Sequence, residues 1–116
     1  MSNVKFTVGG AFEEEASRQF IDAWHRAERG ETFHERHLAF ESWDTLSRVL
    51  NGKRMELLRY VRRNKVTSVR ALAKELKRDY SNVHADVKAL AGAGLLDTTA
   101  KGVRADYDAI ETRIAI

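Results

Sequence analysis

Three amphipathic helical patterns follow one another between residues 53 and 91, separated only by short polar segments. The first covers residues 53–64, the second begins after Ser68, and the third begins after Asp79. Ser and Asp are preferred N-cap residues, so they indicate where the second and third helices start. Only Lys77-Arg78-Asp79 separates these two helices, and a turn of this length sets two helices at a steep angle. This succession of helices constrains the fold more than any other feature of the sequence.

A β-hairpin is predicted after the third helix. Gly92 and Gly94 end the helix, the apolar pair Leu95-Leu96 follows, and the polar stretch beyond it is expected to turn at Lys101-Gly102. The order helix, short helix, tight turn, helix, hairpin is that of a winged helix-turn-helix domain, which we predict over residues 42–107.

The segments on either side of this domain carry weaker signals. Residues 1–41 are predicted to form an N-terminal strand-helix extension, with a strand at Asn3–Val8 and a helix over residues 11–29. Residues 108–116 form a C-terminal tail that alternates Ile with polar residues, which favours a strand, although Asp108–Arg113 could instead be helical. The predicted fold class is therefore mainly α with small β elements: a winged helix-turn-helix with an N-terminal strand-helix extension.

Positive charge is concentrated in the middle of the chain. The net charge of all 116 residues is +3, but residues 53–104 hold thirteen Lys and Arg against five Asp and Glu, a net charge of +8. Residues 1–52 carry a net charge of −3, and residues 105–116 carry −2. A segment this basic is expected to face a polyanion, with a solvated basic surface as the simpler alternative.

The third helix, about residues 79–91, is predicted to be a recognition helix in the major groove. Its outward positions hold short or polar side chains close to its N-terminus, where base edges are reached. Asn pairs with adenine, and Lys or His donates to guanine acceptors, although Asn82 could instead cap its own helix. Basic side chains of the second helix, the turn and the hairpin, a wing at about residues 95–106, are expected to hold phosphates. The predicted DNA-binding residues are Arg70, Lys74, Lys77, Arg78, Ser81, Asn82, His84, Ala85, Lys88, Lys101 and Arg104.

A family resemblance is carried by Leu50–Arg59, Ser68–Leu76, Arg78–Leu90 and Ala93–Leu96. These stretches resemble the MarR/ArsR-type winged-helix regulators and, more narrowly, a group of short prokaryotic transcriptional regulators that includes antitoxin-like DNA-binding proteins. The resemblance covers about residues 38–107. It implies binding to double-stranded DNA and regulation of transcription, and it supplies no effector ligand.

Other function classes find little support in the sequence. The chain has no cysteine, which excludes disulfides and thiolate chemistry. His34 and His37 lack the spacing of a helical zinc motif, and Gly9-Gly10 lacks a phosphate-binding pattern. No apolar run reaches the ~18 residues that a membrane-spanning helix needs. We therefore expect no enzymatic activity, no metal, no cofactor and no membrane partner, and a cytoplasmic location.

The sequence predicts a repressor or autoregulator that binds a pseudo-palindromic site as a homodimer, because one domain of this size buries little DNA surface. The apolar stripe through Phe12, Phe20 and Trp24 and the Ile-rich tail are the candidate dimer surfaces. Trp43 is expected in the core, with an interface as the alternative. Two other hypotheses stay open: an antitoxin that binds DNA and neutralises a toxin protein, and a protein-interaction module without a nucleic-acid partner.

Overall fold

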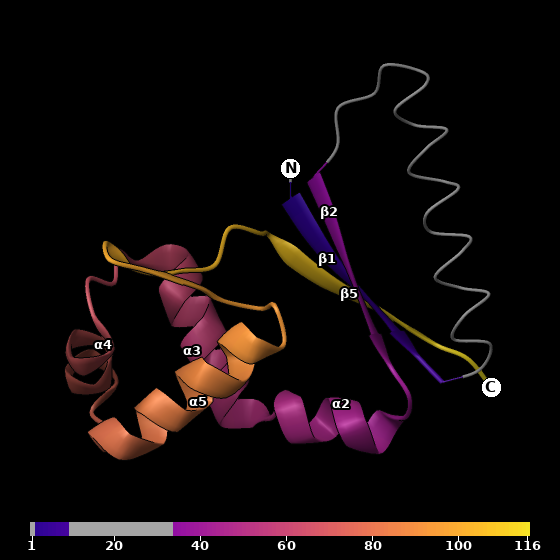
Figure 1. Ribbon diagram of the computed structural model, residues 1–116, viewed down its shortest axis with the longest axis horizontal. Coiled ribbons are helices and arrows are strands. Elements are labelled where there is room, and N and C mark those ends of the chain that lie inside the picture. Colours follow the sequence, from indigo (N-terminus) through magenta and orange to yellow (C-terminus); the bar gives the residue numbers. More distant parts are fainter. Residues whose placement is uncertain (1, 10–33) are drawn as a thin grey trace. The chain divides into compact units, whose positions relative to one another are not determined.

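The computed structural model describes residues 2–9 and 34–116 (Figure 1). The described residues form four helices and five strands. The chain divides into two compact units, which we call the sheet unit (Met1–Leu46 and Tyr107–Ile116) and the helical unit (Ser47–Asp106). The helix expected over residues 11–29 lies outside the described residues. In chain order the elements are β1 (Ser2–Val8), β2 (His34–Phe40), α2 (Trp43–Val49), α3 (Gly52–Arg63), α4 (Val69–Leu76), α5 (Tyr80–Gly92), β3 (Asp97–Thr99), β4 (Gly102–Arg104) and β5 (Ala109–Ile114).

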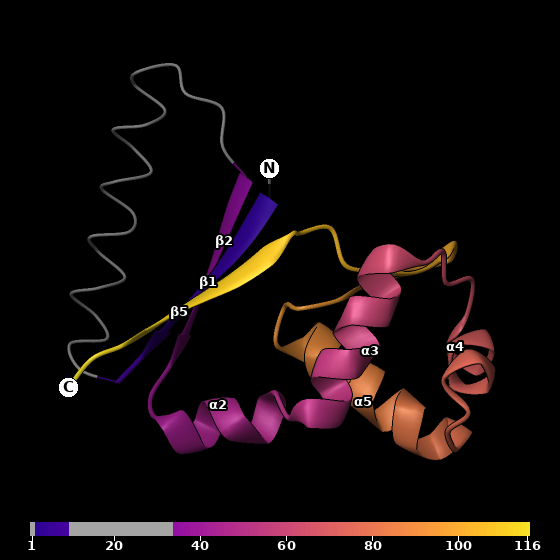
Figure 2. The same cartoon turned by 180° about the vertical axis from the view of Figure 1, so that it is seen from behind.

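A three-stranded parallel sheet organises the sheet unit, with β1 between β2 and β5 (Figures 1 and 2). Val4, Phe6 and Val8 alternate along β1 and are at most 2% exposed. Phe40 of β2 meets Phe6 edge to face, with ring centroids 5.2 Å apart. Thr7, on the opposite face of β1, is buried as well. Buried residues thus lie on both faces of the central strand, as is usual for parallel sheets.

The predicted fold class is wrong. The chain is not a mainly α winged helix-turn-helix protein with small β elements, because its described strands include a three-stranded parallel sheet. The strand predicted at Asn3–Val8 is present, and the tail is a strand rather than a helix. Asn3 of β1 pairs with Ala109 of β5, more than 100 positions later in the sequence. β1 also pairs with β2, and residues 10–33 lie between these two strands in the sequence. The local alternation of apolar residues indicates β1 and β5 but not which strands pair, so the sheet could not be predicted from it.

Trp43 also departs from expectation. It begins α2 and is 56% exposed rather than buried in the core. Leu46 is the buried residue of α2. Ser42 caps this helix, because its hydroxyl oxygen accepts from the Thr45 backbone N–H at 3.3 Å.

In the helical unit, polar caps fix where the three following helices begin. The side chains of Asn51, Ser68 and Asp79 accept from the backbone N–H three residues later, at 3.0, 3.0 and 3.3 Å. The caps predicted at Ser68 and Asp79 are therefore confirmed. Apolar side chains from these helices and from the segment after α5 make the core, where the following are fully buried: Leu57, Leu72, Val83, Leu90 and Leu95.

The turn between α4 and α5 is Lys77-Arg78-Asp79, as predicted. Lys77 has a left-handed backbone, with φ of 55°. Its N–H donates to the Lys74 carbonyl at 3.2 Å, and the Arg78 N–H donates to the Ala73 carbonyl at 3.0 Å. This pair of bonds is a Schellman closure, which ends a helix and redirects the chain at once.

The hairpin of β3 and β4 turns one residue earlier than predicted, at Ala100-Lys101. Gly102 is instead the first residue of β4, with φ of 130°. A Cβ at this position would collide with the Val66 carbonyl oxygen, which accepts a hydrogen bond from the Val103 N–H at 3.0 Å. A glycine is therefore needed here because two backbones approach closely, and not because the chain turns at this residue.

Candidate nucleic-acid interface

Helix α5 has one buried and one exposed face. Val83, Val87 and Leu90 are at most 3% exposed and form the inner face. The five positions predicted to reach base edges are all exposed: Ser81, Asn82, His84, Ala85 and Lys88. A helix with this division of side chains offers a polar surface on a rigid support.

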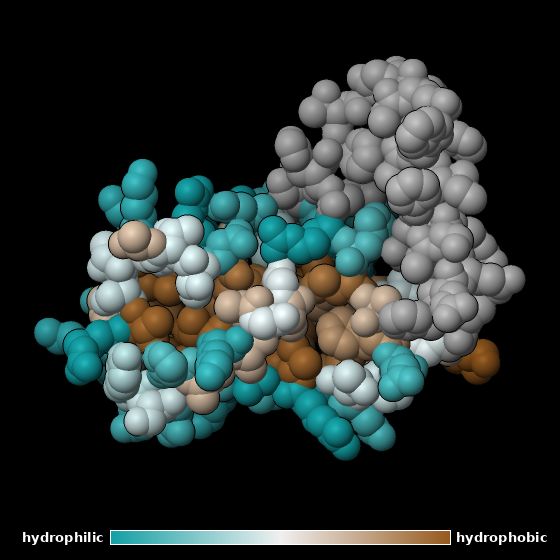
Figure 3. Space-filling view, viewed as in Figure 1, coloured by the Kyte–Doolittle hydropathy of each residue, from teal (hydrophilic) through white to brown (hydrophobic). Residues whose placement is uncertain are grey.

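Exposed basic side chains come from α4, the α4–α5 turn and the hairpin, all in the helical unit. Arg70 and Lys74 lie on α4, which packs against α5, and Lys77 lies in the turn between them. Lys101 lies in the hairpin turn and Arg104 on β4, and both are exposed. In the space-filling view, hydrophilic side chains project from the outer rim at α4 (Figure 3).

The two units of the chain carry net charges of opposite sign. The helical unit holds fourteen Lys and Arg against six Asp and Glu, a net charge of +8. The sheet unit holds six Lys and Arg against eleven Asp and Glu, a net charge of −5. The positive charge of the chain is therefore concentrated in the helical unit.

Two of the predicted phosphate-binding side chains form ion pairs within the protein. Arg78 is half-buried, and its Nη2 atom lies 2.7 Å from Asp86 Oδ2. Arg104 lies 3.2 Å from Asp106, but both side chains are more than half exposed, so water competes strongly with this pair. Arg104 therefore stays available to a phosphate, whereas Arg78 serves the interior of the unit.

Asp86 joins two arginines from different elements. Besides Arg78, it accepts a hydrogen bond from Arg54 Nε on α3 at 3.0 Å, and its side chain is only 13% exposed. Arg54 Nη1 also donates to the carbonyls of Arg48 and Val49, at 2.9 and 2.8 Å. One carboxylate thus ties α5 to α3 and to the α4–α5 turn, and Arg54 extends this network to the end of α2.

The pKa of Asp86 reflects two opposing causes. Burial, the largest, raises the pKa, but the hydrogen bonds and charges of Arg78 and Arg54 together outweigh it. The net result is a pKa below the ordinary value for Asp. The carboxylate is therefore ionised at neutral pH and holds both guanidinium groups.

The sequence analysis missed Asp86 and Arg54. A signal was present, because Asp86 falls within the apolar stripe of α5, between Val83 and Leu90. An acid on the inner face of a helix needs a positive partner, and α3 carries several arginines. The pattern alone does not tell which of them reaches Asp86.

Tyr80 is a second residue that the sequence analysis missed. It is the first residue of α5 and is 39% exposed. The Arg70 guanidinium lies 4.5 Å above the centre of its ring, and the His84 ring lies 5.7 Å away. An aromatic residue outside the apolar stripe at the start of a helix was the available signal. The three side chains form one exposed stack at the N-terminal end of α5.

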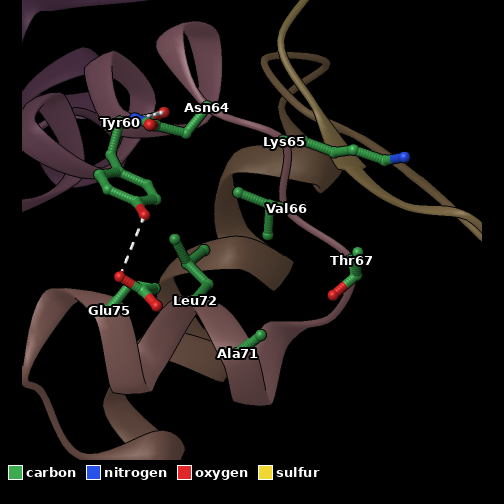
Figure 4. Close-up of a pocket in the computed structure, with 8 residues that line it drawn as sticks. All are labelled: Tyr60, Asn64, Lys65, Val66, Thr67, Ala71, Leu72 and Glu75. Carbon is green, nitrogen blue, oxygen red and sulfur yellow. Dashed lines mark hydrogen bonds between the residues drawn. The ribbon is translucent and has the colours of Figure 1, made fainter.

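A pocket of about 320 Å³ lies between α3, the segment after it, and α4 (Figure 4). Its polar feature is Tyr60, whose hydroxyl donates to Glu75 at 3.5 Å, while the Lys65 side chain extends away from this pair. Burial first, and then the charge and hydrogen bond of Glu75, raise the pKa of Tyr60, so the phenol stays protonated. The pocket is lined by Tyr60, Asn64, Lys65, Val66, Thr67, Ala71, Leu72 and Glu75. It contains none of the predicted DNA-binding residues.

Residues 2–9 and 34–116 contain neither a metal-binding cluster nor a membrane-spanning helix. No three His, Asp or Glu side chains gather there in a way that would hold a metal ion. None of the helices in these ranges has the length and apolar content needed to cross a membrane.

No curated protein and no solved structure matches the chain. One family model, HVO_A0114, matches residues 49–112, more than half of the 116 residues. The match spans α3 to α5, the hairpin and the first part of β5. The chain therefore belongs to the HVO_A0114 family.

Proposed function

We propose that this chain is a sequence-specific regulator of transcription that binds double-stranded DNA through α5. The observation that carries the proposal is the division of α5 into a buried apolar face and an exposed polar face. The major groove is about 12 Å wide and admits one α-helix. A helix already anchored on its inner side can enter that groove without giving up any of its core.

Asn82 and Lys88 are the side chains assigned to base edges. The Asn82 side chain makes no hydrogen bond within the described residues, and its backbone N–H is the group that Asp79 caps. Its carboxamide is thus available for a bidentate contact with adenine, while Lys88 can donate to the O6 and N7 atoms of guanine. Each such contact discriminates against the wrong base.

The surrounding cations are assigned to the phosphates. Arg70 and Lys74 lie on α4, which packs against α5, and Lys77 lies in the turn before α5. Lys101 and Arg104 lie on the hairpin. Contacts to phosphates hold the register of the protein on DNA but carry no sequence information. These five cations are part of the fourteen Lys and Arg that give the helical unit its net charge of +8.

The hydrogen bonds of Asp86 to Arg54 and Arg78 help to hold the proposed recognition helix in position. These two charged hydrogen bonds hold α5 against α3 and against the α4–α5 turn. A helix fixed in this way loses little conformational freedom when it binds, so less of the interaction energy is spent on ordering.

The test starts by selecting the preferred duplex from a randomised library and adding the DNA upstream of the gene. Mobility shifts then compare the wild type, Asn82→Ala/Lys88→Ala and Arg59→Ala on the selected duplex and on a scrambled one. Arg59 is an exposed cation of α3 and serves as the control for loss of charge. We expect the double variant to lose about 10- to 100-fold of affinity for the selected duplex and much less for the scrambled one.

Arg59→Ala should leave the ratio of the two affinities unchanged. The proposal fails if the wild type binds selected and scrambled duplexes equally, or if the double variant keeps the wild-type ratio. Unchanged regulation by the double variant in cells would favour a protein-interaction module.

A further inference from the structure

Strand β5 has an open edge. It pairs with β1 on one side, and no described strand pairs with its other side (Figure 2). Along the strand, Ile110 is half-buried and Ile114 is 50% exposed. An edge strand of this kind presents unpaired backbone groups to any strand that fits beside it.

The hydrogen bonds to β1 fix which residues of β5 face outward. The Ala115 N–H donates to the Val8 carbonyl at 3.0 Å, so the backbone groups of Ala115 point toward β1. Backbone groups alternate in direction along a strand. The N–H and C=O groups of Ile110, Thr112 and Ile114 therefore point away from β1, toward the open edge.

We propose that β5 pairs antiparallel with β5 of a second copy of this chain, around a two-fold axis at Thr112. Thr112 then lies opposite Thr112 of the second copy, with outward backbone groups facing one another as the ladder requires. Glu111 lies opposite Arg113, and by symmetry Arg113 lies opposite Glu111. Ile110 likewise lies opposite Ile114 on the other face of the sheet, which covers an exposed Ile side chain in each copy.

The charges of β5 select this register over its neighbours. Moving the axis by one residue toward the N-terminus places Glu111 opposite Glu111 of the second copy. Moving it by one residue toward the C-terminus places Arg113 opposite Arg113. Like charges directly opposite one another destabilise a sheet, whereas opposite charges stabilise it. Strand β5 is thus complementary to itself in one register.

The pairing gives the predicted homodimer a defined interface and does not rest on DNA binding. It makes one continuous sheet from the sheets of two copies, with an isologous contact as two-fold symmetry demands. Oligomeric state is measured without DNA, so a failure here leaves the recognition surface of α5 untested, and the reverse also holds.

The first experiment is a charge-reversal cycle read by sedimentation velocity over a concentration series. Glu111→Arg and Arg113→Glu each place like charges opposite one another twice per dimer, and each should raise the dimer Kd about tenfold or more. The double variant restores opposite charges and should return the Kd close to the wild-type value. Lys5 of β1 lies beside Glu111, so circular dichroism and thermal unfolding of each variant confirm that the chain is folded.

The second experiment blocks the ladder without changing charge. Thr112→Pro removes an N–H that faces the open edge, a position where an edge strand tolerates proline. This variant should sediment as a folded monomer, and Thr112→Val, which keeps the N–H, should remain dimeric.

A cysteine probe reads the register directly, because the chain has no cysteine of its own. Opposite residues in a hydrogen-bonded antiparallel pair have Cα atoms about 5.5 Å apart, within the span of a disulfide. Thr112→Cys should therefore cross-link under mild oxidation. Glu111→Cys, whose copies are diagonal neighbours, and Thr99→Cys on the hairpin should cross-link far less.

The proposal is overturned if the wild type is monomeric throughout the concentration series, or if folded Thr112→Pro remains a dimer. A dimer that tolerates both single charge reversals, or that cross-links through Glu111→Cys rather than Thr112→Cys, would rule out the register.

Discussion

At the scale of single residues, Asp86 ties α5 to two other parts of the helical unit through ion pairs with Arg54 and Arg78. Its carboxylate faces two guanidinium groups, and the side chains of the three residues are between 13% and 20% exposed. Removing one partner from such a group leaves charges that water reaches only in part. The loss is then larger than for the exposed pair of Arg104 and Asp106.

Asp86→Asn is expected to lower the free energy of unfolding at neutral pH by about 1–3 kcal/mol, because two charged hydrogen bonds lose their acceptor charge. The pKa of Asp86 is below its ordinary value in the folded state, so its stabilising effect is present above the pKa of the unfolded chain. That effect is lost as the pH falls through the folded-state pKa. Chemical denaturation of wild type and variant from neutral pH to below about pH 4 should show the difference shrinking in acid.

Asp106→Asn is the matched control for this series. It removes an exposed acid with an exposed partner and should change stability by less than about 0.5 kcal/mol. A difference between wild type and Asp86→Asn that stays constant down to the lowest pH would contradict the account of the ion pairs.

Residue-level prediction from sequence succeeded where the helical period alone decides. The exposure of Ser81, Asn82, His84, Ala85 and Lys88 follows from the positions of the apolar residues on α5. Arg78 could not be placed in this way, because its partner Asp86 lies on the inner face of the next helix. Contacts between elements depend on packing, which the period of one helix does not contain.

At the scale of elements, those with local signals were predictable. Caps and Schellman closures lie within a few residues of the helix ends that they define, so α4 and α5 and the turn between them follow from the sequence. The hairpin turn was misplaced by one residue. Gly102 was predicted as a turn residue, but a glycine is required there because the Val66 backbone lies against it. The parallel sheet was missed because its strands come from both ends of the chain.

The hairpin is expected to contribute affinity without specificity. Replacing Lys101 and Arg104 together by Gln removes two contacts to phosphates and should reduce the slope of log affinity against log salt by about 2. Affinity for selected and scrambled duplexes should fall by the same factor, which fluorescence anisotropy at several salt concentrations measures.

Asn82→Ala should behave in the opposite way to the hairpin variant, with a change in sequence preference and none in salt dependence. Its salt slope should equal that of the wild type, while its preference for the selected duplex falls. A hairpin variant that changes sequence preference would show that β3 and β4 contact bases instead.

At the scale of the whole molecule, the surfaces proposed for DNA recognition and for assembly lie in different units. The helical unit carries the basic surface, and the sheet unit, with a net charge of −5, carries the self-complementary strand. This separation predicts that the dimer can be broken without damage to the DNA-contacting residues.

Thr112→Pro should therefore bind a duplex with one half-site as tightly as a wild-type monomer does. On a duplex with two half-sites, its affinity should fall at least tenfold below that of the wild type, because the second half-site no longer benefits from tethering. Titrations of both duplexes measure this difference. Equal affinities of variant and wild type for the duplex with two half-sites would show that assembly through β5 does not serve DNA binding.

The interleaved order of the units also has a consequence for synthesis. The ribosome releases residues 47–106 before β5, so the helical unit can fold as soon as it emerges. The three-stranded sheet can be completed only later, because β5, which pairs with β1, is synthesised after the helical unit. A nascent chain would then form the helix proposed to contact DNA before the strand proposed to pair with a second copy, so that incomplete chains lack that pairing edge.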